Sequence, residues 1–146
     1  GHGDSMVAML GSTEVDGKKI KELINEGKLT EEKLDQIIER TKKGGAEIVK
    51  YLEKGSAFYA PAASGVEMAE AYLKNLQKQL PCAVYLDGEY GVKDIYAGVP
   101  VIIGSKGVEK VIELDLTAEE KENFKKSINT VKDLFDAAKK IDSSLK

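Results

Sequence analysis

Three short β-rich runs in the second half of the chain restrict its fold more than any other feature. They read CAVYLDGEYG (82–91), IYAGVPVIIG (95–104) and EKVIEL (109–114), and only a few residues separate one from the next. A crossover between parallel strands needs a dozen or more residues, so connections this short permit only antiparallel pairing. The region therefore predicts an antiparallel meander.

Helical periodicity dominates the flanking regions. Apolar residues recur on one face over residues 31–54, with Thr30 as the expected N-cap, and Gly44-Gly45 predicts a kink or a close helix crossing within this helix. A second helix begins near Pro61 and extends to about residue 79, where Pro81 is expected to stop it. The residues from Thr117 to Glu120 have the pattern of a capping box, which predicts a final helix to about residue 141.

The first residues complete the expected element order. Residues 6–15 are apolar and β-branched enough for one strand or two short ones, and residues 18–26 suit a short helix. The order is then strand, helices, three strands and helix. Because strands and helices are segregated along the chain, this order predicts the α+β class. We expect one domain, residues 1–146, with a twisted antiparallel sheet packed against helices.

Composition excludes several classes of function. The chain has 146 residues and a formal net charge of −3, with no basic stripe for a nucleic acid. No apolar run approaches the roughly 20 residues of a membrane span, and no leader sequence is evident. One cysteine and one histidine exclude an intrachain disulfide and the usual multi-ligand metal sites. We therefore expect a cytoplasmic protein that binds neither metal, membrane nor nucleic acid.

The common nucleotide and nucleophile motifs are missing. There is no P-loop, and the segment from Gly1 to Met6 lacks the third glycine of a dinucleotide fingerprint and follows no strand. Ser12 and Ser64 lie in no G-x-S-x-G motif. Arg40, the only arginine, falls on a predicted helix, where a surface or packing role is expected rather than a substrate contact.

His2 is the strongest single candidate for chemistry. Imidazole is the natural proton carrier near neutral pH, and the flanking glycines let the backbone approach a ligand closely. The alternative is that Gly1-His2 is a remnant of an expression vector.

Five segments together resemble the lactate/malate dehydrogenase family. They are GHGDSM (1–6), ERTKKGGAEIV (39–49), GSAFYAPAAS (55–64), DGEYGVKDIYAGVPVIIG (87–104) and LTAEEKENFKKSI (116–128), and they keep the family's order and spacing over nearly the whole chain. The resemblance is to the malate branch. It implies the C-terminal, substrate-binding domain of that family, with the N-terminal NAD-binding Rossmann domain absent from this chain.

The resemblance also implies roles for particular residues. His2 would be the catalytic proton acceptor when malate is oxidised to oxaloacetate with NAD, while Gly1, Gly3 and Asp4 would support its loop. Ala57 and Ser64 would line the substrate pocket. The arginines that hold the dicarboxylate substrate in this family precede the histidine, so the isolated chain is expected to be inactive and to bind no cofactor. The chain departs from its relatives at Ala8 and Gly11, where they tend to carry Pro and Arg.

Two alternatives remain open at this point. The substrate could be lactate or another 2-hydroxy acid, because the family's choice depends largely on a loop outside this chain. The chain could also be a non-enzymatic oligomerisation module. In either case, the absence of a partner domain should leave apolar surface exposed, so we expect a homo-oligomer.

Overall fold

A computed structural model describes residues 3–142 and 144–145 of the chain. It divides into two compact units: residues 1–47 with 114–146 form the first unit, and residues 48–113 form the second. None of the helices among the described residues has the length and hydropathy that a transmembrane span requires. The single domain that the sequence suggests stays a prediction.

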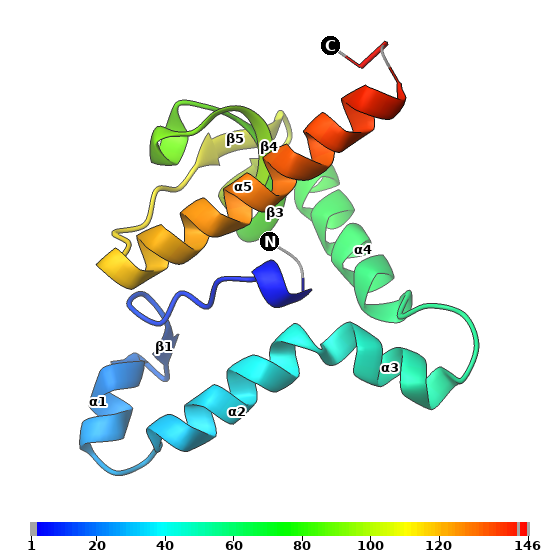
Figure 1. The fold of residues 1–146 in the computed structure, drawn as a ribbon. Helices are drawn as coiled ribbons and strands as arrows, with labels where there is room; N and C mark the ends of the chain where they lie inside the picture. The colour runs from blue at the N-terminus through cyan, green and yellow to red at the C-terminus, as the bar shows by residue number, and fades with distance from the viewer. Residues whose placement is uncertain (1–2, 143, 146) are drawn as a thin grey trace. The chain divides into compact units, whose positions relative to one another are not determined.

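The second unit contains the antiparallel sheet that the sequence predicts (Figure 1). Strands β3 (Lys78–Asp87), β4 (Lys93–Gly104) and β5 (Gly107–Val111) pair in the order β3-β4-β5, with a short 3-10 helix η2 (Glu89–Gly91) between the first two. Helix α4 (Tyr59–Leu73) contacts β4. The antiparallel meander and the α+β class are confirmed.

Alternating side chains of β3 and β4 form the core of this unit. Leu80, Cys82 and Leu86 of β3 are buried, and each faces a buried residue of β4: Val101, Val99 and Ile95. Alternation with a period of two buries one face of a strand and leaves the other exposed. The sheet therefore has one apolar face.

The expected helix to residue 79 is wrong at its end. Helix α4 stops at Leu73, and two residues with left-handed backbone follow, Asn75 (φ 51°) and Gln77 (φ 50°). Leu76 and Leu80 have helical spacing in the sequence only by coincidence. Leu76 lies beyond the end of α4, and Leu80 lies in β3, which begins at Lys78.

Pro81 therefore lies inside β3 instead of terminating a helix, directly opposite Pro100 of β4. The carbonyl of Pro100 accepts a hydrogen bond from Ile112 N–H at 2.8 Å, on the far side from β3. Pro81 and Pro100 therefore form no ladder hydrogen bond with each other. The nitrogen of Pro81 faces the edge of β3 that has no neighbouring strand in the sheet. An edge strand tolerates proline because no neighbour needs its N–H.

The first unit is mainly helical. It comprises a 3-10 helix η1 (Gly3–Ser5), a two-stranded ribbon of β1 (Glu14–Val15) and β2 (Lys18–Lys19), and helices α1 (Ile20–Asn25), α2 (Glu31–Lys42) and α5 (Ala118–Ile141), while α3 (Gly44–Leu52) crosses into the second unit. Thr30 caps α2, and Thr117 with Glu120 forms the capping box of α5. The expected caps and the final helix are confirmed.

Two expectations in this unit are corrected. Of residues 6–15 only Glu14 and Val15 are in a strand, because none of the strands that the structure describes lies beside residues 6–13. The carbonyl of Met9 instead accepts hydrogen bonds from Ser12 N–H and the Thr13 hydroxyl in a turn. The expected single helix is divided at Lys43 (φ −95°, ψ 3°), and the double glycine forms the first two residues of α3 instead of kinking one helix. Among the described residues nothing lies within 4 Å of a Cβ built on either glycine, so neither marks a close crossing.

Candidate functional site

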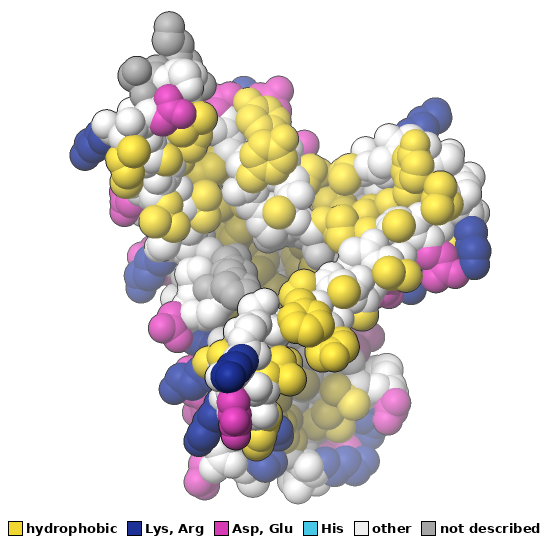
Figure 2. All heavy atoms as spheres, turned by 90° about the vertical axis from the view of Figure 1, so that its right-hand side faces the viewer, with side chains coloured by type: hydrophobic (Ala, Val, Ile, Leu, Met, Phe, Trp, Pro, Cys, Tyr) yellow, Lys and Arg dark blue, Asp and Glu magenta, His cyan; other side chains and the backbone are white. Residues whose placement is uncertain are grey.

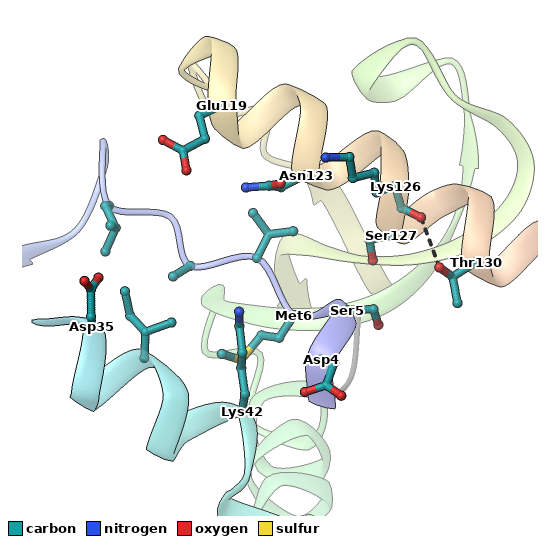
Figure 3. A pocket seen from close by; sticks show the side chains of 14 residues that line it. Asp4, Ser5, Met6, Asp35, Lys42, Glu119, Asn123, Lys126, Ser127 and Thr130 are labelled. Carbon is teal, nitrogen blue, oxygen red and sulfur yellow. Dashed lines mark hydrogen bonds between the residues drawn. The ribbon is translucent and has the colours of Figure 1, made fainter.

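The residues that follow the predicted catalytic histidine line a cavity of about 540 Å³ in the first unit (Figure 3). Asp4 and Ser5 of η1 contribute to its wall. Gly3 adopts a left-handed backbone (φ 59°), and its carbonyl accepts a hydrogen bond from Met6 N–H at 3.0 Å, which turns the chain directly after the motif. The other motif residues, Gly1 and His2, lie outside the described residues.

Three elements build this cavity. Besides η1 and the segment after it, helix α2 supplies residues at helical spacing and helix α5 supplies a second row (Figure 3). The lining residues are Asp4, Ser5, Met6, Val7, Ala8, Leu10, Asp35, Ile38, Lys42, Glu119, Asn123, Lys126, Ser127 and Thr130. Positions three, four and seven apart lie on one face of a helix, which is why each helix presents its residues together.

The cavity combines an apolar wall with polar groups. Ser127 is 4% exposed, and its hydroxyl is drawn toward the cavity in Figure 3. The ammonium of Lys42 lies 3.5 Å from Glu39, and that of Lys126 lies 4.0 Å from Glu122, so each lysine has a carboxylate on its own helix. Apolar walls with a few polar groups are typical of sites for small molecules.

A second, almost entirely apolar cavity of about 460 Å³ lies in the same unit. Helix α2 contributes Leu34, Ile37, Ile38 and Thr41 to its wall, and α1 contributes Ile20 and Leu23. Four residues line both cavities: Met6, Ala8, Leu10 and Ile38. Three residues of the segment 6–10 therefore border both cavities.

Glu120 ties this segment to α5. The Glu120 carboxylate accepts hydrogen bonds from the backbone N–H of Gly11 at 2.9 Å and of Thr117 at 2.8 Å. Glu120 is 7% exposed. Burial opposes its ionisation, but the bonds from Gly11 and Thr117 outweigh this effect and lower the pKa of Glu120 below its ordinary value.

The predicted pocket residues Ala57 and Ser64 lie in the second unit. Ala57 is half-buried in the loop before α4, two residues after Gly55, whose φ is 90°. Ser64 is exposed on α4, and Pro61 lies in the first turn of that helix as expected. The substrate role of Ala57 and Ser64 stays a prediction.

Arg40 already has a carboxylate partner. Its Nε and one terminal nitrogen donate to the two carboxylate oxygens of Glu47 at 3.0 and 2.9 Å. This bidentate bond lowers the pKa of Glu47. The arrangement fits the surface role that the sequence suggested for Arg40.

The sequence analysis missed the residues that α2 and α5 bring to the cavity. Their only signal is a polar stripe at helical spacing, such as Glu119, Asn123, Lys126 and Thr130. Such a stripe is equally typical of a solvent-exposed face. Nothing local to α5 indicates that the segment after the motif lies against it.

The fold and the motif together define a class of protein. The model of the alpha/beta C-terminal domain of lactate/malate dehydrogenases matches residues 1–141, and the chain belongs to this family. Malate dehydrogenase of Pelagibacter ubique is 62% identical over 145 residues, which cover 99% of this chain and 45% of that protein. The chain thus spans less than half the length of the curated relatives it matches.

Solved structures agree with this assignment. Malate dehydrogenase from Salinibacter ruber has a TM-score of 0.90 and 43% identity, covering 100% of this chain and 46% of that one. Lactate dehydrogenase from Eimeria maxima, solved with NADH and oxamate, has a TM-score of 0.93 and 42% identity, covering 97% of this chain and 44% of that one. The resemblance first noted in five segments therefore holds for the fold as well.

Proposed function

We propose that this chain is the C-terminal half of an NAD-dependent malate dehydrogenase that interconverts malate and oxaloacetate. The observation that carries the proposal is the 62% identity to a malate dehydrogenase over 99% of this chain. The remaining part of such a protein, N-terminal to this chain, would hold the nucleotide and the substrate-binding arginines. On this proposal the isolated chain is inactive.

His2 would act as the proton carrier. Oxidation of the C2 alcohol removes a hydride from carbon and a proton from the hydroxyl, and neutral imidazole accepts that proton as the carbonyl forms. In the reverse direction, imidazolium donates the proton to the oxygen of the ketone. The left-handed turn at Gly3 and the hydrogen bond from Met6 to its carbonyl support this role, because they fix the direction of the chain directly after His2.

The residues described here do not fit a dinucleotide. Helix η1 has only three residues, which is too short for a phosphate-binding helix N-terminus. We therefore assign NAD, the hydride acceptor of the reaction, to the other half. Asp4 and the glycines of the motif would support the histidine loop, and Ala57 and Ser64 would face the substrate.

Exposed apolar side chains support the proposal that further protein covers part of this chain. On α4, Val66 is 68% exposed and Leu73 is 78% exposed, while Ala71 is the one buried residue of this helix. Figure 2 shows hydrophobic side chains at the surface on the face that it draws. Large exposed apolar areas mark surfaces that other protein covers. We propose a homo-oligomer in the cytoplasm, where the buried free thiol of Cys82 would stay reduced.

A fusion protein tests the proposal. The part of the Pelagibacter ubique malate dehydrogenase that precedes its matching segment would be joined to this chain, and oxaloacetate-dependent oxidation of NADH would be followed by absorbance. We expect turnover by the fusion, none by the chain alone, and loss of turnover in the fusion carrying His2→Asn. A fusion that folds and binds NADH but reduces no oxaloacetate would refute the proposal.

Lactate is the second candidate substrate. The similarity to lactate dehydrogenase from Eimeria maxima, with a TM-score of 0.93, favours it. Pyruvate offered to the same fusion distinguishes the two, because a clear preference for pyruvate would replace malate by lactate in the proposed function.

A further inference from the structure

We propose that Glu120 is a positioning residue, which holds residues 3–11, the segment after His2, against α5 and thereby sets the place of His2. This inference rests on the proposed function for its consequence in catalysis. Its structural part, that Glu120 determines the position of residues 3–11, stands on the geometry of the first unit.

Packing alone holds this segment weakly. Met6, Ala8 and Leu10 border both the polar cavity, of about 540 Å³, and the apolar cavity, of about 460 Å³. Side chains that border open space have fewer packing partners than side chains in a close-packed core. The position of the segment therefore depends on its hydrogen bonds more than that of a close-packed strand does.

Most of those hydrogen bonds are local. In the described part of the chain, Met6 N–H bonds to Gly3, Ser12 N–H to Met9, and the carbonyl of Thr13 accepts from Ile20 N–H. Bonds of this kind shape the segment but do not attach it to another element. The bond from Gly11 N–H to Glu120 does, because it joins residues 109 positions apart.

The Glu120 carboxylate is itself held firmly. One oxygen accepts from Gly11 N–H, the other accepts from Thr117 N–H, and the Glu120 N–H donates to Thr117 Oγ1 at 3.2 Å. The side chain is thus fixed to the first turn of α5, and η1 also contacts this helix. A movement of the α5 N-terminus would be transmitted to Gly11 and from there to Asp4 and Ser5.

Gly11 allows this contact because it has no side chain. A Cβ at position 11 would lie 3.1 Å from Thr117 Cγ2 and 3.2 Å from Glu120 Oε2, closer than ordinary van der Waals contact. A side chain there would push the backbone N–H away from the carboxylate.

Glu120→Gln in the fusion protein tests the proposal. The glutamine side chain has the same shape as glutamate, but an NH2 group replaces one of its two acceptor oxygens. Either Gly11 N–H or Thr117 N–H therefore loses its hydrogen-bond acceptor. We expect kcat/KM for oxaloacetate to fall about 10- to 100-fold, as small displacements of catalytic groups do. The pH profile of kcat should shift and the KM for NADH should not. Glu122→Gln, the same change at an exposed position of α5, is the matched control and should keep wild-type values.

Gly11→Ala provides an independent route to the same defect. If the contact acts as one unit, Gly11→Ala and Glu120→Gln together should lower kcat/KM no further than the stronger single change. Additive losses, or a lower melting temperature with an unchanged pH profile, would overturn the proposal and leave Glu120 as a helix cap only.

Amide NMR spectra of the chain alone separate this inference from the proposed function. In Glu120→Gln, but not in Glu122→Gln, we expect the signals of Asp4, Ser5 and Gly11 to shift or broaden. An inactive wild-type fusion would count against the proposed function, and these spectra would still decide the positioning role. Unchanged signals of Asp4 and Ser5 in Glu120→Gln would refute it.

Discussion

The buried carboxylate of Glu120 accepts a 2.9 Å hydrogen bond from the backbone of Gly11. The two residues come from opposite ends of the chain, and the contact depends on a property of each of them. Glu120 needs a donor to remain ionised while buried, and Gly11 needs the absence of a side chain to bring its N–H close enough.

Gly11→Ala should destabilise the chain. The added methyl group meets Thr117 and Glu120 at 3.1–3.2 Å, and overpacking of this kind costs about 1–3 kcal/mol. Gly45→Ala is the control, since its Cβ meets nothing within 4 Å in the described structure and it lies in α3. That change should stabilise by up to about 1 kcal/mol through helix propensity. Urea unfolding measures both, and equal effects would contradict the contact at Gly11.

Stability should fall at acid pH through Glu120. The pKa of Glu120 is lower in the folded chain than its ordinary value, so its contribution is complete above the unfolded-state pKa. The contribution is lost as the pH falls through the folded-state value. We therefore expect the difference in unfolding free energy between wild type and Glu120→Gln to shrink between pH 7 and about pH 3. A constant difference would mean that the hydrogen bonds do not depend on ionisation.

Asn75 should be sensitive to substitution for two separable reasons. Its backbone is left-handed, and its Oδ1 accepts bonds from Ser105 N–H and the Gln77 amide, each at 2.9 Å. Asn75→Gly removes only the side-chain bonds, whereas Asn75→Ala also introduces about 1 kcal/mol of backbone strain. In chemical denaturation, the free energy of unfolding should therefore be highest for wild type, lower for Asn75→Gly and lowest for Asn75→Ala. A more stable Ala variant would show that the left-handed turn does not persist.

The Cys82 thiol should be protected in the native chain. The residue is buried opposite Val99, and burial raises the pKa of its thiol, so little reactive thiolate is present. Labelling with a disulfide reagent should be slow in buffer and fast in denaturing urea. Its rate should rise with urea in parallel with unfolding. Rapid labelling in buffer would indicate that β3 opens locally.

Charges on α4 should weaken self-association. Val66 and Leu73 are largely exposed, and each apolar side chain of this size contributes about 1.5–3 kcal/mol when an interface buries it. Light scattering should therefore detect association of the wild-type chain and at least a roughly tenfold weaker association of Val66→Glu with Leu73→Glu. Leu134→Glu, on α5 and 67% exposed, is the control. A wild-type chain that stays monomeric at high concentration would refute the proposed oligomer.

Periodic elements were predictable from the sequence because their signals are local. The alternation in 95–104 and the capping box at Thr117 each depend on residues within one element, and the structure has both. The end of α4 was not predictable, since Leu76 and Leu80 imitate helical spacing while the backbone turns left-handed at Asn75. Spacing alone does not reveal a backbone conformation.

The wall of the candidate site was less predictable. Asp4 belongs to a motif that the sequence displays, but Ser127 shares the cavity wall only because the segment after the motif folds against α5. Residues 6–13 resemble a strand in composition, but no strand in the described part of the chain pairs with them. Composition therefore misled where a long-range hydrogen bond, which leaves no local pattern, determines the structure.

The proline pair of β3 and β4 bears on how the exposed apolar surface is tolerated. Because the nitrogen of Pro81 faces the free edge of β3, a strand from another molecule would find no donor there with which to extend the sheet. Edge strands with a complete set of donors are templates for amyloid-like stacking. The missing donor at Pro81 therefore opposes extension of the sheet at this edge, so the proline bears on aggregation as well as on the fold.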